Sequence, residues 1–139
     1  MFELYLSFWK QGLDFQTRTN RGDYWAIMLM QILVSFCVDL LFFWWLPIVA
    51  NIFSLVSLLP MLAIGARRLH DIGFSGWWQL LYILILPVFV FIILHCLKSN
   101  EFTNKYGEQI PETRNFIPYL IANIIIIAIL SFLVNFAQI

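Results

Sequence analysis

Long apolar segments are the feature that most restricts the folds open to this chain. A helix of about 20 residues crosses the hydrocarbon core of a bilayer, which is roughly 30 Å thick. Four segments approach or exceed this length, at residues 24–45, 47–65, 77–97 and 116–136. Charged residues make up only 12% of the 139 residues, whereas a soluble domain carries about 25%. A chain this short cannot bury so much apolar surface within itself, so the sequence predicts an all-α, polytopic helical membrane bundle with four transmembrane segments.

The stretch before the first apolar segment has a different pattern. Aromatic and aliphatic residues recur there at helical spacings, at Phe2, Tyr5, Leu6, Trp9 and Leu13. This pattern predicts an amphipathic helix within residues 1–16 that lies in the membrane interface, and the alternative is a frayed tail. Charged and aromatic residues precede any long apolar run, which is the wrong order for a cleavable signal peptide. The first transmembrane segment is therefore expected to direct insertion.

Polar residues, prolines and a glycine mark where the predicted membrane helices begin and end. Asn20 or Asp23 can cap the free backbone N–H groups at the start of the first helix. Pro47 suits the first turn of the second helix, where a missing N–H costs nothing. This second helix is expected to kink at Pro60 and to end at Gly73. The turn between the first two helices must therefore be tight.

The distribution of lysine and arginine predicts the orientation, because cytoplasmic loops carry an excess of both. If all four segments span, five basic residues fall on the side of the N-terminus: Lys10, Arg18, Arg21, Arg67 and Arg68. The other side then holds three: Lys98, Lys105 and Arg114. The N-terminus is therefore expected to be cytoplasmic. A second arrangement stays open, in which segment 77–97 turns back at Pro87 as a re-entrant segment and all eight basic residues share one side.

The composition argues against several classes of function. The formal net charge is zero, so no global field points to nucleic acid. Cys37 and Cys96 both lie in apolar segments, where they are expected as packing residues rather than as a disulfide. The spacing of the cysteines and histidines is not typical of a metal site. We therefore expect neither a metal nor a cofactor.

One polar stretch between two apolar segments carries the most distinctive motif. Residues 67–78 read RRLHDIGFSGWW, and this stretch closely resembles the signature of the domain of unknown function 805 family. Two weaker matches agree in order, RTNRGDYW at residues 18–25 and NKYGEQIP at residues 104–111. The resemblance covers roughly residues 4–112. It implies a small multi-pass protein of the bacterial inner (cytoplasmic) membrane, and it supplies no established reaction, substrate or catalytic residue.

The sequence departs from this family near its C-terminal end. The family's Asn-x-Tyr/Phe-Gly stretch normally comes close to the end of the chain, whereas here a further apolar segment follows it. We therefore divide the chain into a membrane domain at residues 1–112, which resembles the family, and an additional C-terminal transmembrane helix at residues 113–139. A function that depends on a free C-terminal tail is not expected here.

A cluster of ionisable residues is expected at the cytoplasmic ends of the first two membrane helices: Arg18, Arg21, Asp23, Arg67, Arg68, His70 and Asp71. One interpretation is structural: Asp71 pairs with one arginine, Asp23 pairs with another, and the pairs fix the angle between membrane segments. A second is a binding site for an anionic lipid headgroup or another phosphate, formed by the four arginines together with His70. The third makes His70 a catalytic base that Asp71 orients, but no nucleophile is clearly placed beside them.

A second polar group is expected inside the bilayer. Asp39, Asn51 and His95 fall at a similar depth if all segments span fully. A charge at that depth is costly, so it normally has a partner or faces water. The sequence leaves open an Asp39–His95 pair that acts as a proton- or ion-coupled site. The structural interpretation is an Asp39 that snorkels, or is protonated, and bonds to Asn51.

These observations favour a non-enzymatic integral membrane protein that binds anionic lipid headgroups or a protein partner through the cytoplasmic cluster. The alternative is a small transporter or channel that uses Asp39 and the proline-broken segments. Four short spans make a thin scaffold for a monomeric pathway, so this alternative needs a homo-oligomer. A membrane enzyme is the least favoured class, because the sequence offers no nucleophile, metal set or phosphate loop. Membrane lipids, anionic phospholipid among them, are the expected partners, and nucleic acid is not.

Overall fold

Helices form the regular structure of the chain. The computed structural model describes residues 2–42, 46–80, 88–112 and 114–137. Over these residues the helices are α1 (Phe2–Lys10), α2 (Arg21–Phe42), α3 (Pro47–Asp71), α5 (Val88–Cys96) and α6 (Ile117–Ala137), and no β-strand occurs among them. The predicted all-α class is therefore confirmed.

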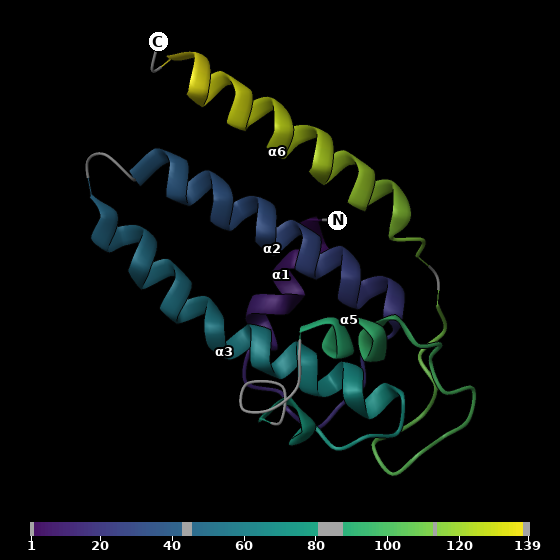
Figure 1. Ribbon diagram of the computed structural model, residues 1–139. Coiled ribbons are helices and arrows are strands. Elements are labelled where there is room, and N and C mark those ends of the chain that lie inside the picture. Colours follow the sequence, from purple (N-terminus) through teal and green to yellow (C-terminus); the bar gives the residue numbers. More distant parts are fainter. Residues whose placement is uncertain (1, 43–45, 81–87, 113, 138–139) are drawn as a thin grey trace.

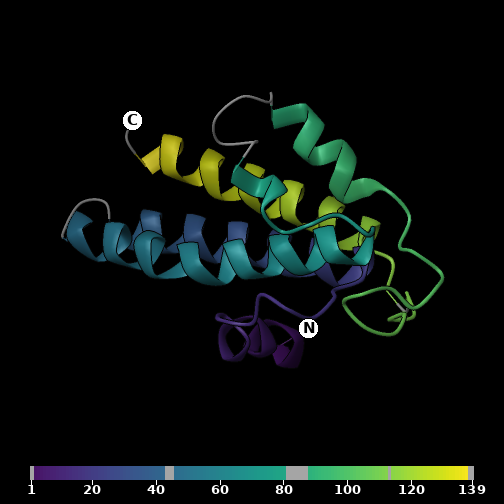
Figure 2. The ribbon, with the colours of Figure 1, turned by 90° about the horizontal axis from the view of Figure 1, so that it is seen from below.

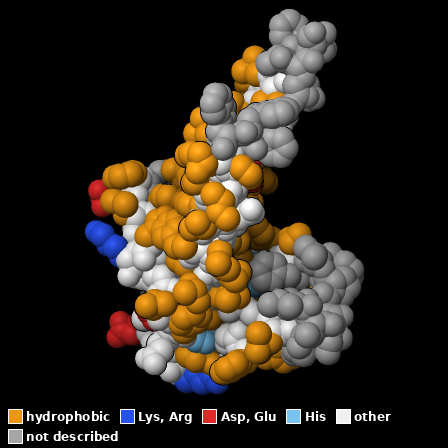
Figure 3. Space-filling model, turned by 90° about the vertical axis from the view of Figure 1, so that its left-hand side faces the viewer, with side chains coloured by type: hydrophobic (Ala, Val, Ile, Leu, Met, Phe, Trp, Pro, Cys, Tyr) orange, Lys and Arg blue, Asp and Glu red, His pale blue; other side chains and the backbone are white. Residues whose placement is uncertain are grey.

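Three of the helices, α2, α3 and α6, are long and apolar enough to cross a membrane. α2 and α3 form an antiparallel pair, and α6 runs alongside α2 in the direction that α2 takes (Figure 1). Large apolar side chains on these helices are exposed, such as Leu41, Leu55 and Ile124. Hydrophobic side chains cover much of the face drawn in Figure 3, and the charged ones stand at its edge. Such a surface is expected where helices meet lipid rather than water.

The local signals at the ends of α2 and α3 act as the sequence predicts. Asn20 Oδ1 accepts the backbone N–H of Asp23 at 2.8 Å, so Asn20 caps α2. Pro47 lies in the first turn of α3. At the other end of α3, Gly73 has a φ of +88° and donates its backbone N–H to the carbonyl of His70 at 3.1 Å. A left-handed glycine in this position ends a helix.

α1 packs across the α2–α3 pair (Figure 2). The Phe8 side chain is fully buried against Ile27 of α2 and Ile64 of α3. The Tyr5 hydroxyl donates to Gln31 Oε1 at 2.7 Å. These contacts attach α1 to the two membrane helices, whereas its predicted place in the membrane interface stays a prediction.

The apolar stripe predicted for the first helix is only partly buried against the protein. Phe2 and Leu13, which belong to the predicted stripe, are 67% and 77% exposed, whereas Phe8 is 0% exposed. Tyr5 and Trp9, which also belong to the predicted stripe, pack against the buried cluster that contains Phe8. The contacts of α1 with α2 and α3 decide which side chains it buries, and the spacing of apolar residues alone does not report that choice. The helix also ends at Lys10, short of the predicted boundary at residue 16.

The third apolar segment returns to the end of the bundle where it starts. α3 ends at Asp71, and the backbone N–H of Asn100 donates to the Asp71 carbonyl at 3.1 Å. The hydrogen bond contradicts a single full crossing by residues 77–97, because it joins the residues that flank this segment on its two sides. It fits the re-entrant arrangement. Pro87, the predicted turning point, lies outside the described residues. Trp45, the predicted end of the first apolar segment, lies outside them as well.

Candidate functional site

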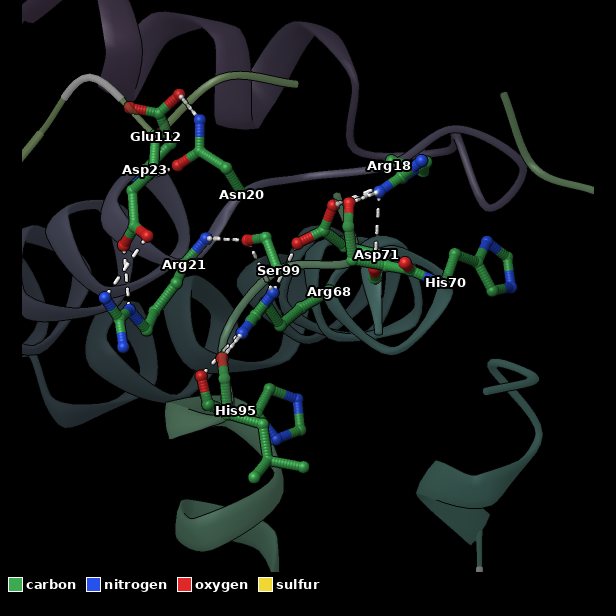
Figure 4. Close-up of polar contacts among 12 residues, drawn as sticks. Arg18, Asn20, Arg21, Asp23, Arg68, His70, Asp71, His95, Ser99 and Glu112 are labelled. Atoms are coloured by element: carbon green, nitrogen blue, oxygen red, sulfur yellow. Dashed lines mark hydrogen bonds and ion pairs between the residues drawn. The ribbon is translucent and has the colours of Figure 1, made fainter. Parts of the chain in front are cut away.

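Two arginines from different parts of the chain converge on one aspartate at the end of α3. Arg18 Nη2 lies 2.9 Å from Asp71 Oδ1, and Arg68 Nη1 lies 2.5 Å from Asp71 Oδ2. All three side chains are at most 1% exposed. Figure 4 shows both guanidinium groups reaching the same carboxylate. We call Arg18, Arg68 and Asp71 the buried arginine cluster.

Arg18 connects the end of α3 to the loop that follows α5. Its Nε and Nη2 donate to Asp71 Oδ1, and Nη2 also donates to the Asn100 carbonyl at 2.9 Å. Its Nη1 donates to the carbonyls of Phe102, at 3.1 Å, and Gly107, at 3.0 Å. Every nitrogen of the guanidinium therefore has a protein acceptor. Arg18 acts as a structural tie rather than as a free cation for a ligand.

Arg68 holds the C-terminal end of α5. Its Nε donates to the His95 carbonyl at 3.1 Å, and its Nη2 donates to the Leu97 carbonyl. Its Nη1 also lies 3.4 Å from Ser99 Oγ. A cation at this position compensates the negative end of the α5 dipole as well as the Asp71 carboxylate. Arg68 is thereby committed to holding the returning segment against α3.

Arg21 and Asp23 pair with residues that immediately precede α6. Arg21 binds Glu112 through two hydrogen bonds of 2.8 Å and 3.2 Å. Asp23 Oδ1 lies 2.7 Å from Arg114 Nε, so Asp23 does pair with an arginine, but with one outside the predicted cluster. A Cβ on Gly22 would lie 2.2 Å from the Arg114 carbonyl oxygen. The missing side chain of Gly22 thus lets the chain approach α2 closely just before α6 begins.

His70 joins two loops to the end of α3. Its Nδ1 lies 3.2 Å from the carbonyl oxygen of Thr17, which can only accept, so Nδ1 donates in this bond. The imidazole stacks on Tyr106 with ring centroids 3.6 Å apart. Both oxygens of the neighbouring Asp71 carboxylate are bound by arginines. Asp71 is therefore not placed to orient His70 as a catalytic base.

Arg67 is the predicted site arginine whose nitrogens are not all bound by protein. It is 3% exposed, and its Nη1 donates to Gln11 Oε1 at 2.5 Å. Its Nε is buried and has no hydrogen-bond partner among the described residues. Buried polar groups nearly always have a partner, so an exception of this kind calls for an explanation.

The Arg67 side chain lines a cavity of about 300 Å³ where α1, α2 and α3 meet. Polar residues form most of its wall, among them Ser7, Gln11, Asp14, Thr17, Asn20 and Asp23. Three apolar residues, Leu4, Ile27 and Ile110, complete it together with Arg18 and Thr19. We call this space the Arg67 cavity. An unsatisfied cationic nitrogen beside a polar cavity is an arrangement that can hold an anion.

Of the three predicted intramembrane residues, Asp39 and Asn51 lie at the same end of the α2–α3 pair, whereas His95 lies at the other end. Asp39 is exposed near the end of α2, and Asn51 is exposed near the start of α3. His95 lies at the opposite end of α2, where its ring centroid is 4.7 Å from that of Tyr24. The Asp39–His95 pair is therefore wrong, because the returning segment places His95 beside the first turn of α2. Within the described residues no interaction joins Asp39 to another side chain, so the transporter alternative has no polar pair here.

The fold and the site define a class of protein. It is an integral helical membrane protein in which buried arginines attach a returning segment and a polar loop to a pair of long helices. Among the described residues, no three His, Cys, Asp or Glu side chains are grouped closely enough to hold a metal ion.

The chain belongs to the family described as "Protein of unknown function (DUF805)", whose sequence model matches residues 12–108. It is similar to two Escherichia coli (strain K12) proteins named inner membrane protein YhaI and inner membrane protein YhaH. YhaI is 32% identical over 109 residues, which cover 76% of this chain and 92% of YhaI. YhaH is 30% identical over 113 residues, which cover 76% of this chain and 93% of YhaH. No solved structure matches the chain significantly.

The family match confirms the resemblance that the motifs predict. The matched residues include the buried arginine cluster and the loop that Arg18 binds, whereas α6 begins at Ile117, beyond the match. Nothing in the relatives' names indicates a reaction, and both names refer to the inner membrane.

Proposed function

We propose that this chain is a multi-pass protein of the bacterial inner membrane with its N-terminus in the cytoplasm. In this arrangement α2, α3 and α6 span the bilayer, and the segment between α3 and α6 enters it and returns. The hydrogen bond between Asn100 and Asp71 supports the return. All eight lysines and arginines then lie on the cytoplasmic side, which agrees with the known bias of cytoplasmic loops.

Single cysteines in a background without Cys37 and Cys96 test this topology. Phe102 is 75% exposed in the loop after α5, and Leu46 is 51% exposed between α2 and α3. We expect a membrane-impermeant maleimide, added to spheroplasts with an intact inner membrane, to label Leu46→Cys. Phe102→Cys should stay unlabelled until the inner membrane is permeabilised. Labelling of Phe102→Cys from the outside would contradict the proposed topology.

We also propose that the protein is non-enzymatic and binds the phosphate of a lipid headgroup at the Arg67 cavity. The observation that carries this proposal is the buried, unpartnered Nε of Arg67. Guanidinium N–H groups match phosphate oxygens in geometry and charge. In the proposed topology the cavity lies at the cytoplasmic ends of α2 and α3, where headgroups are found. Arg18 and Arg68 do not bind the lipid in this proposal, because protein acceptors bind their guanidinium groups. They hold the end of α5 and the loop after it against α3.

Removing the charge of Arg67 is expected to release bound phospholipid. Arg67→Gln keeps a donor for Gln11 and loses the cation. We expect the purified variant to retain at least about tenfold less phospholipid than the original chain, because a hydrogen bond to a charged group contributes about 1.5–3 kcal/mol. Mass spectrometry of lipid that co-purifies with the full chain measures this.

Lys98→Ala is the matched control, because it removes an exposed cation that pairs only locally with Glu101. The control should retain the original amount of phospholipid. Equal retention by a folded Arg67→Gln variant would disprove binding at the Arg67 cavity.

A further inference from the structure

The Arg67 cavity contains a negative charge as well as a positive one. Asp14, in the loop after α1, lines the same space as Arg67. Within the described residues no hydrogen bond or ion pair joins the two side chains. The second carboxylate of the cavity, Asp23, is already paired with Arg114 at 2.7 Å. The second arginine of the cavity, Arg18, is paired with Asp71 at 2.9 Å. The charges that remain without an ionic partner are therefore one guanidinium and one carboxylate.

Local hydrogen bonds fix the Asp14 carboxylate in place. Its Oδ1 accepts the backbone N–H groups of Gln16, at 2.9 Å, and Thr17, at 3.3 Å. Its Oδ2 accepts the hydroxyl of Thr17 at 2.6 Å. An ionised carboxylate offers about four lone-pair sites, so it can accept a further hydrogen bond.

The pKa of Asp14 supports an ionised carboxylate. Partial burial acts to raise this pKa, but the hydrogen bonds from Thr17 and Gln16 and the positive charge of Arg67 outweigh burial. The pKa of Asp14 consequently lies below its usual range. At neutral pH the cavity thus presents a carboxylate that is influenced by Arg67 without being bound to it.

We propose that the Arg67 cavity binds a headgroup that carries both a phosphate and a primary ammonium group, with the phosphate on Arg67 and the ammonium on Asp14. This inference rests on the proposed binding of lipid phosphate and selects a zwitterionic headgroup, namely the phosphoethanolamine type, in place of the anionic one expected from the sequence. With a phosphate alone, Arg67 would face two anions, the phosphate and Asp14, and one negative charge in the cavity would stay uncompensated. The cavity volume of about 300 Å³ far exceeds the roughly 30 Å³ of one water, so it admits such a group.

The preference between two lipids tests the inference. The purified full chain is mixed with equal amounts of phosphatidylethanolamine and phosphatidylglycerol that have the same acyl chains, and the bound ratio is measured by native mass spectrometry. We expect the original chain to prefer phosphatidylethanolamine. In Asp14→Asn, which keeps an acceptor for the N–H groups of Gln16 and Thr17, we expect the ratio to move about tenfold toward phosphatidylglycerol.

Asp39→Asn is the matched control, because it removes an exposed carboxylate near the other end of α2, and its ratio should equal that of the original chain. An original chain without preference, or an unchanged ratio in Asp14→Asn, overturns the choice of headgroup. If Arg67→Gln still loses its phospholipid in that case, the proposed function stands and only this inference fails. If Arg67→Gln keeps its phospholipid, the proposed function fails as well.

Soluble probes separate a lipid from a free compound that carries the same groups. Phosphoethanolamine and inorganic phosphate are added separately to the chain loaded with phosphatidylethanolamine. Displacement by phosphoethanolamine at concentrations where phosphate has little effect supports recognition of both charges. If the chain shows no lipid preference, a lipid headgroup of the phosphoethanolamine type is overturned as the ligand. Direct binding of phosphoethanolamine, but not of inorganic phosphate, by the delipidated chain would then assign the charge pair to a free compound. Equal displacement by the two probes would count against a role for the ammonium group.

Discussion

Asp71→Ala is expected to destabilise the folded protein by about 3–5 kcal/mol, the usual cost of removing one partner from a buried ion pair. The Asp71 carboxylate separates two guanidinium groups, and its side chain and that of Arg68 are both 0% exposed. Without it, Arg18 and Arg68 would stay buried as like charges close together. The cost arises because neither arginine can reach water without releasing the backbone carbonyls that it binds.

The midpoint of unfolding in detergent, by heat or denaturant, measures this loss. Asp39→Ala is the control, because it removes an exposed carboxylate of α2 and should change the midpoint little. Asp71→Asn should fall between the two, because the amide keeps one oxygen acceptor and loses the charge. A midpoint for Asp71→Ala equal to that of the control would show that the Asp71 carboxylate does not stabilise the folded protein.

Sequence reasoning predicts those features of this fold that depend on neighbouring residues. The cap at Asn20, the proline in the first turn of α3 and the stop at Gly73 involve contacts within a few residues. Residue type limits the backbone geometry at such positions, and the signal is therefore visible in a short window. The three long apolar helices were predictable for a similar reason, since length and composition alone identify them.

The site was less predictable, because most acceptors for its arginines are backbone carbonyls. Arg18 binds the carbonyls of Asn100 and Phe102, and Arg68 binds those of His95 and Leu97. Every residue has a carbonyl, so the sequence does not mark which ones a distant arginine will reach. For the same reason the sequence left open whether the third segment crosses the membrane or returns, since those bonds hold the return in place.

The availability of each arginine was equally hidden. Arg67 and Arg68 are adjacent in the sequence, yet protein acceptors bind every nitrogen of Arg68, whereas the Nε of Arg67 is buried and unpartnered. Successive residues on a helix point about 100° apart, so the two side chains enter different surroundings. The contribution of Asp14 had no signal of its own, because it depends on how α1 folds back over α2 and α3.

Arg18→Lys is expected to loosen the loop after α5 although it keeps the positive charge. A lysine can pair with Asp71, but its single nitrogen cannot replace the planar fork that reaches the carbonyls of Asn100, Phe102 and Gly107. Each carbonyl that stays buried without a donor costs about 1–3 kcal/mol. We expect a lower unfolding midpoint together with faster hydrogen exchange and proteolysis within residues 98–108.

Arg21→Lys provides the comparison that separates fork geometry from charge. Arg21 also forms two hydrogen bonds to a carboxylate, but its side chain is 33% exposed, and that of its partner Glu112 is 26% exposed. Water can replace what a lysine fails to bind there, so the loss should stay below about 1 kcal/mol. If Arg18→Lys lost no more stability than Arg21→Lys, the positive charge alone would hold the loop after α5, and the planar guanidinium of Arg18 would not be required. A loss of stability confined to Arg18→Lys would instead show that the hydrogen bonds of this guanidinium attach the loop to the end of α3, beside the Arg67 cavity.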